Sequence, residues 1–115
     1  MPRLVTAGLL GATAIALGAF GAHGLKERFA LIPEALGWWE TATFYLLTHA
    51  VAIGAIAVRS ALPARLWGMG SAIFAGTLYA MALGAPRWFG AITPIGGSLL
   101  IAGWVVLAWT ARKES

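Results

Sequence analysis

Cysteine and aspartate are both absent from the 115 residues of this chain. Without a thiolate, the sequence excludes disulfides, iron–sulfur clusters and thiolate zinc sites. Without an aspartate to orient a histidine, and with no Gly-x-Ser-x-Gly sequence around a serine, it also lacks the usual patterns of nucleophilic catalysis. These absences predict a protein that is not an enzyme, and nothing in the sequence points to a cofactor or a metal.

Charge is scarce, since only 10% of the residues are charged whereas 60% are apolar. A soluble domain of this size buries too little surface to hide so many apolar side chains. The few basic residues stand at the ends of apolar runs and not in a continuous stripe, which argues against nucleic acid as a partner and favours lipid headgroups. The composition therefore indicates that a lipid bilayer surrounds the chain.

Four long uncharged apolar runs fill most of the chain, at residues 4–22, 41–58, 66–85 and 91–111. At about 1.5 Å of rise per residue, each run is long enough to cross a hydrocarbon core of about 30 Å as a helix. The runs do not alternate with polar residues, which excludes a β-barrel. The sequence predicts an all-α membrane protein, in which residues 1–115 form one four-transmembrane-helix bundle with up-down topology.

The basic residues beside the runs predict the orientation of the helices. One side would carry Arg3, Arg59, Arg65, Arg112 and Lys113, and the other side would carry Lys26, Arg28 and Arg87. Because an excess of Lys and Arg marks the cytoplasmic side, both termini are predicted to be cytoplasmic. The predicted location is the cell inner (plasma) membrane, with the chain crossing it several times.

The longest connection, residues 23–40, has an amphipathic pattern. Leu25, Phe29, Ile32 and Leu36 recur at helical spacing among charged residues. This segment is predicted to lie along the outer membrane surface.

Local signals predict how the second and fourth long helices begin. Pro33 suits the first residue of a helix, and Trp38 and Trp39 would then mark the membrane interface. At the start of the fourth helix, Thr93 is predicted to cap the free amides, with Pro94 in the first helical position.

Small residues recur along the first run at alternating steps of four and three. The positions are Ala7, Gly11, Ala14, Gly18 and Gly21, which we call the small-residue seam. In lipid, such a seam lets a second helix approach closely, so that dispersion and backbone contact stabilise the pair. The spacing leaves open whether the second helix belongs to the same chain or to another subunit.

Polar residues inside the predicted spans are the candidate functional residues, because each is costly in hydrocarbon unless it is paired. The set is His23, Glu40, Tyr45, His49, Tyr79 and Thr93. On the second span, Thr41, Tyr45, Thr48 and His49 share one helix face, which should point into the bundle or into a subunit interface. All of these positions fall in the outer half of the bilayer or at its centre.

His49, near the predicted bilayer midplane, is open to three interpretations. A neutral ring could donate to a backbone carbonyl or to Tyr79 and accept at its other nitrogen, which would join helices. Alternatively, His49 could handle protons or substrate in a small oligomeric transporter or channel, with Glu40 near the outer mouth. A haem or metal site shared with His23 is disfavoured, because the two histidines differ in depth by about half the hydrocarbon thickness.

Several sequence blocks resemble a known family. They are Gly18-Ala-Phe-Gly-Ala-His23-Gly-Leu25, residues 45–50 ending in His49-Ala50, residues 74–79, and Thr93-Pro-Ile-Gly-Gly97 followed by Gly103-Trp104. Over nearly its whole length, the chain is similar to the YgdD-like family of small membrane proteins, known as domain of unknown function 423. The resemblance implies a bacterial inner-membrane protein of four helices, related also to a small eukaryotic membrane protein family, with no established activity, substrate or cofactor.

The sequence therefore favours a membrane protein that acts through helix packing, as a homo-oligomer or in contact with lipid or another membrane protein. The alternative is the transporter or channel that uses His49 and Glu40. A third hypothesis, a haem- or quinone-associated membrane subunit, requires a cofactor that the sequence does not indicate.

Overall fold

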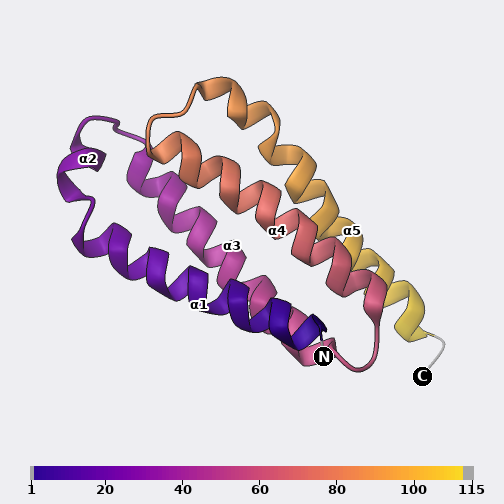
Figure 1. Ribbon diagram of the computed structural model, residues 1–115. Helices are drawn as coiled ribbons and strands as arrows, with labels where there is room; N and C mark the ends of the chain where they lie inside the picture. The colour runs from indigo at the N-terminus through magenta and orange to yellow at the C-terminus, as the bar shows by residue number, and fades with distance from the viewer. Residues whose placement is uncertain (1, 113–115) are drawn as a thin grey trace.

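Residues 2–112 are described by a computed structural model, in which helices are joined by short connections (Figure 1). The elements are α1 (Pro2–His23), α2 (Lys26–Ala30), α3 (Ala35–Ile56), α4 (Ala61–Ala82), the 3-10 helix η1 (Arg87–Ala91) and α5 (Thr93–Ala111). No strand occurs within residues 2–112. The all-α prediction is confirmed, and Lys113, which contributed to the predicted orientation, lies outside the described residues.

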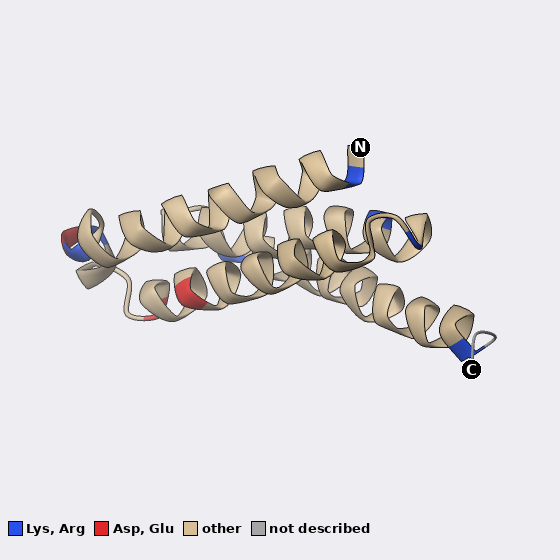
Figure 2. Cartoon of the chain, turned by 90° about the horizontal axis from the view of Figure 1, so that it is seen from below, with Lys and Arg blue, Asp and Glu red and all other residues tan. Residues whose placement is uncertain are grey.

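The four long helices pack in the order of the sequence and alternate in direction (Figure 1). α3 packs against α1 and α4, α4 also packs against α5, and α1 touches α4 only slightly. Short connections force successive helices together, but nothing brings α5 back to α1. The arrangement is therefore an open row, and the two edge helices diverge toward the chain ends (Figure 2).

Within residues 2–112, two helical stretches are long and apolar enough to cross a membrane by length and composition, namely α1 and Arg87–Ala111, which comprises η1 and α5. Both lie at the edges of the row, and most of their side chains are exposed. α3 and α4 occupy the middle of the row and supply most of the buried residues.

The segment between α1 and α3 covers the helix ends on one side of the molecule, where α1 ends and α3 begins. Phe29 of α2 is buried, and Leu25 and Ile32 are partly buried against the same core cluster. Leu36, predicted on the same apolar face, is exposed. The apolar side of this segment therefore packs mainly on the protein's own core.

Two predictions about the start of α3 are wrong. The helix begins at Ala35, after Pro33, with Glu34 as its N-terminal flanking residue. Trp39, expected at an interface, is buried, and its indole N–H donates to the Leu17 carbonyl of α1 at 2.7 Å. Its ring packs edge-on against Tyr79, with centroids 4.5 Å apart, so Trp39 is a core residue that joins three helices.

α4 ends in a glycine-dependent motif. Gly84 has a φ of +108°, a conformation that side chains disfavour. Its N–H donates to the Met81 carbonyl at 3.0 Å, and the N–H of Ala85 donates to the Ala80 carbonyl at 2.9 Å. This is the Schellman pattern, which satisfies carbonyls that a helix C-terminus otherwise leaves unpaired. The Arg28 guanidinium donates to the Leu83 carbonyl and so ties α2 to the same helix end.

The predicted cap of α5 is wrong in detail. Ile92, and not Thr93, flanks the helix N-terminus, and no side chain caps it. The Thr93 hydroxyl is instead hydrogen-bonded to the Thr77 hydroxyl of α4, with the oxygens 2.6 Å apart. Pro94 does stand in the first turn, where its missing N–H costs no helix hydrogen bond.

The charged residues gather toward the two ends of the long helices, with α2 and η1 at one end and the chain termini at the other (Figure 2). The three described glutamates share the α2 end, where Arg87 pairs with Glu34 at 3.1 Å and lies over the Trp38 ring. The backbone N–H of Glu34 and the Arg87 guanidinium lower the pKa of the Glu34 carboxyl below its usual value. The opposite end, within residues 2–112, carries arginines and no acid.

Candidate functional site

His49 is the only histidine that the structure buries, and both of its ring nitrogens are hydrogen-bonded. Nδ1 lies 2.7 Å from the Tyr45 carbonyl of the same helix, and Nε2 lies 3.1 Å from the Trp104 indole nitrogen of α5. Because a carbonyl only accepts and an indole N–H only donates, His49 is neutral with its proton on Nδ1. One predicted role is thus observed, the joining of two helices, but the partner is Trp104 and not Tyr79.

Aromatic rings surround His49 on three helices. The Trp67 ring of α4 and the Trp104 ring of α5 each lie with their centroids 6.0 Å from the imidazole. These two indoles are 4.4 Å from each other. On the other side, the Tyr45 ring stacks on the imidazole at 6.2 Å and contacts the Phe74 ring at 4.8 Å.

A cavity of about 270 Å³ opens beside His49 at the crossing of α3, α4 and α5. We call it the aromatic cleft; its lining residues are Tyr45, His49, Phe74, Gly97, Leu100, Ile101 and Trp104. Its rim is open to the outside, because Ile101 is 66% exposed and Trp104 is 45% exposed. The walls are mostly apolar, so the cleft suits an apolar occupant.

The α4–α5 crossing below the cleft is very close. A Cβ atom on Gly96 would stand 2.5 Å from the backbone nitrogen of Phe74, and one on Gly70 would stand 2.8 Å from the Gly96 carbonyl oxygen. A Cβ on Gly103 would likewise stand 2.5 Å from Nε1 of Trp67. Only glycine leaves room for two backbones at this distance. Trp67 Nε1 and Ser71 Oγ, both buried on α4, have no hydrogen-bond partner within residues 2–112.

The small-residue seam of α1 faces α3 of the same chain. A Cβ on Gly21 would collide with the Trp39 indole, one on Gly18 would lie 3.1 Å from the Thr43 methyl group, and one on Gly11 would lie 3.8 Å from the Ala50 side chain. The remaining members agree with this placement: Ala14 is fully buried, and Ala7 lies opposite Gly54. In this structure, the helix that packs on the small-residue seam therefore belongs to the same chain.

The other predicted polar residues do not form one cluster with His49. The Tyr79 hydroxyl is hydrogen-bonded to the Thr43 hydroxyl at 2.7 Å, and Thr93 bonds to Thr77 as described. His23 and Glu40 are exposed at the α2 end and take no part in these bonds. At about 3.6 residues per turn, Glu40 and His49 point to opposite faces of α3, about 13 Å apart along its axis.

The predicted polar face of α3 is only partly directed inward. His49 is buried, but Thr41, Tyr45 and Thr48 are exposed on this chain. The inward threonine is Thr43, which the pattern did not single out. Within residues 2–112, no three histidine or acidic side chains gather in a way that could hold a metal ion.

The sequence did not indicate the residues that form hydrogen bonds with the predicted polar residues. Trp104, Thr43 and Thr77 each supply the second half of a hydrogen bond between two helices. A tryptophan or threonine in an apolar helix is common, so neither residue type was a signal by itself. Only the positions of the helix crossings identify these partners.

The His49–Trp104 hydrogen bond can be measured with a double-mutant cycle. His49→Phe and Trp104→Phe keep aromatic volume and remove one partner each, so we expect a coupling free energy of about 1 kcal/mol in detergent unfolding. Trp109 stands further along α5, away from the cleft. The cycle of His49→Phe with Trp109→Phe should therefore be additive, and equal coupling in both cycles would contradict the assigned bond.

Comparison with known proteins shows relatives over nearly the whole chain. Residues 17–97 match the family described as protein of unknown function (DUF423). The chain is 42% identical to a UPF0382 membrane protein of Haemophilus influenzae, with 96% of this chain and 94% of that protein covered. It is 34% identical to a UPF0382 membrane protein of Schizosaccharomyces pombe (88% and 93% covered) and 33% identical to the UPF0382 inner membrane protein YgdD of Escherichia coli K12 (90% and 84% covered). No solved structure gives a significant match.

Proposed function

This chain belongs to the DUF423 family, whose relatives are membrane proteins, and from that premise we propose that it spans the inner membrane four times and acts by lateral contact with other membrane components. In this proposal α1, α3, α4 and α5 are the spans, and both termini are cytoplasmic. The protein carries out no catalysis. The cleft beside His49 is the place of contact.

The charge distribution supports this orientation. The end of the row that holds Arg3, Arg59, Arg65 and Arg112 has no acid within residues 2–112. The end that holds α2 and η1 carries all three described glutamates. An excess of basic residues marks the cytoplasmic side, so the arginine end is placed there.

The observation that carries the proposal is that His49, Tyr79 and Thr93 are each hydrogen-bonded to a side chain of a neighbouring helix. His49 uses both nitrogens, Tyr79 is paired with Thr43, and Thr93 is paired with Thr77. A proton or ion carrier needs groups with free lone pairs along a continuous path. To accept a proton at Nε2, His49 would first have to lose the Trp104 hydrogen bond, so these groups are better suited to joining helices than to conduction.

The transporter alternative has weaker support from the geometry. It requires Glu40 and His49 on one path, but they face opposite sides of α3. In proteoliposomes we therefore expect no more proton flux than in empty vesicles. A flux that His49→Phe abolishes would favour the transporter instead.

The aromatic cleft supports a lateral partner because its rim is open and the α5 backbone beside it is accessible. Ile101 is exposed at the rim, and Gly97 leaves the backbone of α5 accessible beside the Phe74 ring. Small residues next to a groove are the usual contact of one membrane helix with another. The occupant that we propose is an apolar helix of a second membrane-embedded chain.

Site-specific photocrosslinking tests this contact. Ile101 at the cleft rim and Ile15 on α1 are matched in residue type and exposure, at 66% and 65%. With a photoreactive amino acid at either position in native membranes, we expect a protein adduct of defined mass from position 101 and lipid adducts alone from position 15. Lipid adducts alone from both positions would overturn the proposed contact.

A further inference from the structure

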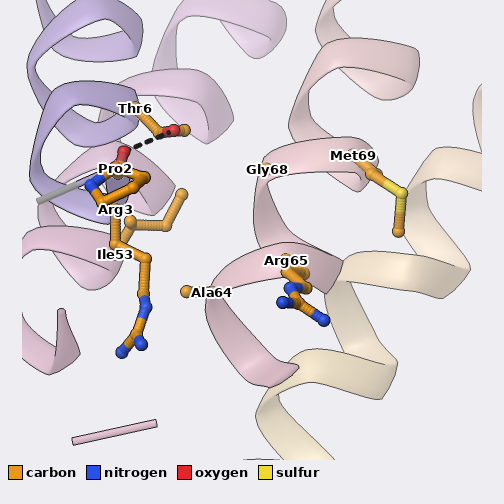
Figure 3. Close-up of a pocket in the computed structure, with 8 residues that line it drawn as sticks. All are labelled: Pro2, Arg3, Thr6, Ile53, Ala64, Arg65, Gly68 and Met69. Atoms are coloured by element: carbon orange, nitrogen blue, oxygen red, sulfur yellow. Dashed lines mark hydrogen bonds between the residues drawn. The ribbon is translucent and has the colours of Figure 1, made fainter. Parts of the chain in front are cut away.

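A second cavity, of about 500 Å³, lies at the arginine end of the helix row, away from the aromatic cleft (Figure 3). We call it the arginine groove; it is lined by Arg3 and Thr6 of α1, Ile53 of α3, and Arg65, Gly68 and Met69 of α4. It exists because α1 packs on α3 and only slightly on α4. α1 and α4 form its walls, and α3 forms its floor.

The two ends of the groove differ in chemistry. Ile53, Gly68 and Met69 make its inner surface apolar, whereas the Arg3 and Arg65 side chains extend from facing helices toward the end of the row (Figure 3). An apolar channel with guanidinium groups at its mouth matches a molecule that has a hydrocarbon chain and an anionic head. A soluble anion would gain nothing from the apolar part, and an uncharged chain would gain nothing from the arginines.

The guanidinium groups have donors to spare. One N–H of the Arg3 guanidinium donates to the Ala57 carbonyl at the C-terminal end of α3. This bond holds the guanidinium in place and leaves others of its five N–H donors for a ligand. Arg65 is exposed, and no hydrogen bond or ion pair joins its side chain to another residue within 2–112. Planar guanidinium groups bind phosphate oxygens in a bidentate manner, with both charge and geometry matched.

Within residues 2–112, no acid competes for these arginines. All three glutamates within residues 2–112 lie at the opposite end of the row (Figure 2). Anionic lipids attract basic residues at the cytoplasmic membrane surface, and basic pockets between membrane helices on that side bind phosphate headgroups.

We propose that the arginine groove binds one anionic phospholipid, with its phosphate between Arg3 and Arg65 and an acyl chain against Gly68 and Met69. This inference rests on the proposed four-span arrangement, which puts the arginine end at the cytoplasmic membrane surface. The bound lipid fills the gap between α1 and α4 that no side chain of the described chain occupies. It thereby stabilises the edge helix α1 against the row.

The test is native mass spectrometry of the full-length protein in detergent with added palmitoyl-oleoyl phosphatidylglycerol or with the phosphatidylcholine of the same chains. We expect wild type to retain one phosphatidylglycerol in preference to phosphatidylcholine, and Arg65→Gln to lower that preference about fivefold. Arg3→Gln should lower it by a similar factor. Arg87→Gln, at the opposite end, is the matched control and should leave the preference unchanged.

Equal retention of the two lipids by wild type, or a preference that survives in Arg65→Gln, would overturn the proposal. Arg65 is exposed, so its variant keeps the fold, and an unchanged thermal unfolding curve checks this point. Excess glycerol phosphate should not displace the lipid; displacement would mean that the headgroup alone is recognised and would also overturn it. A separate experiment tests the orientation in the membrane. The chain has no cysteine, so Ser60→Cys places a single thiol at the arginine end. If a membrane-impermeant maleimide labelled this thiol in intact cells, the proposed orientation would be overturned, whatever the lipid result.

Discussion

Gly96→Ala should destabilise the protein by about 3 kcal/mol, which is at the upper end of the cost of overpacking. The added Cβ would stand 2.5 Å from the Phe74 backbone nitrogen, 2.8 Å from the Gly70 carbonyl oxygen and 2.9 Å from the Phe74 Cα atom. All three are backbone atoms of α4, which no side-chain rotation can move away. α5 must therefore shift away from α4, and the contact of the two helices weakens along its length.

The neighbouring glycine supplies a matched control for this prediction. A Cβ on Gly97 would lie 3.6 Å from the Phe74 ring, which is ordinary van der Waals contact. Since alanine is favoured over glycine in a helix by up to about 1 kcal/mol, Gly97→Ala should be neutral or stabilising. Unfolding by SDS titration in mixed micelles measures both variants, and equal midpoints for the two would contradict the α4–α5 crossing.

The shift in Gly96→Ala should also reach the aromatic cleft. Gly97, Leu100, Ile101 and Trp104 of α5 all line the cleft, so displacement of α5 moves Trp104 away from His49. The proposed contact at position 101 should therefore weaken in Gly96→Ala. This links a packing residue to the proposed function without substitution of any residue that lines the cleft.

The helices and the small-residue seam could be predicted because their signals are local. Apolar runs of sufficient length predict helices directly, and the seam of α1 is visible as a regular spacing within a single element. The structure places Ala14, Gly18 and Gly21 against α3, as a seam on one face requires. For these features the sequence contains the whole pattern within about twenty residues of α1.

For each hydrogen bond of the site, the sequence indicated only one of the two partners, because each bond joins residues far apart in the chain. His49 was recognisable as a polar group at depth, but Trp104 became its partner through the register of α3 against α5. The predicted cap at Thr93 failed for the same reason, since the Thr77 hydroxyl of α4 competes for it. Gly70 and Gly96 likewise belong to two helices, and neither shows its role alone.

Gly21→Ala should also cost about 3 kcal/mol, but by a different route. Its Cβ would collide with the Trp39 indole, whose N–H donates to the Leu17 carbonyl and whose ring packs on Tyr79 and Phe29. Movement of the indole away from the added Cβ would break its hydrogen bond to the Leu17 carbonyl and disturb the aromatic contacts. α1, which is held mainly by α3, should separate from the row first.

Gly8→Ala on the same helix is the control for this variant, because a Cβ there meets nothing within 4 Å. It should leave stability unchanged or raise it by up to about 1 kcal/mol. Near-ultraviolet circular dichroism reports the Trp39 surroundings, and SDS titration reports stability. If Gly21→Ala kept both the wild-type spectrum and the wild-type midpoint, the seam would not pack on Trp39, and the contact of α1 with α3 would have to be placed elsewhere along the helix.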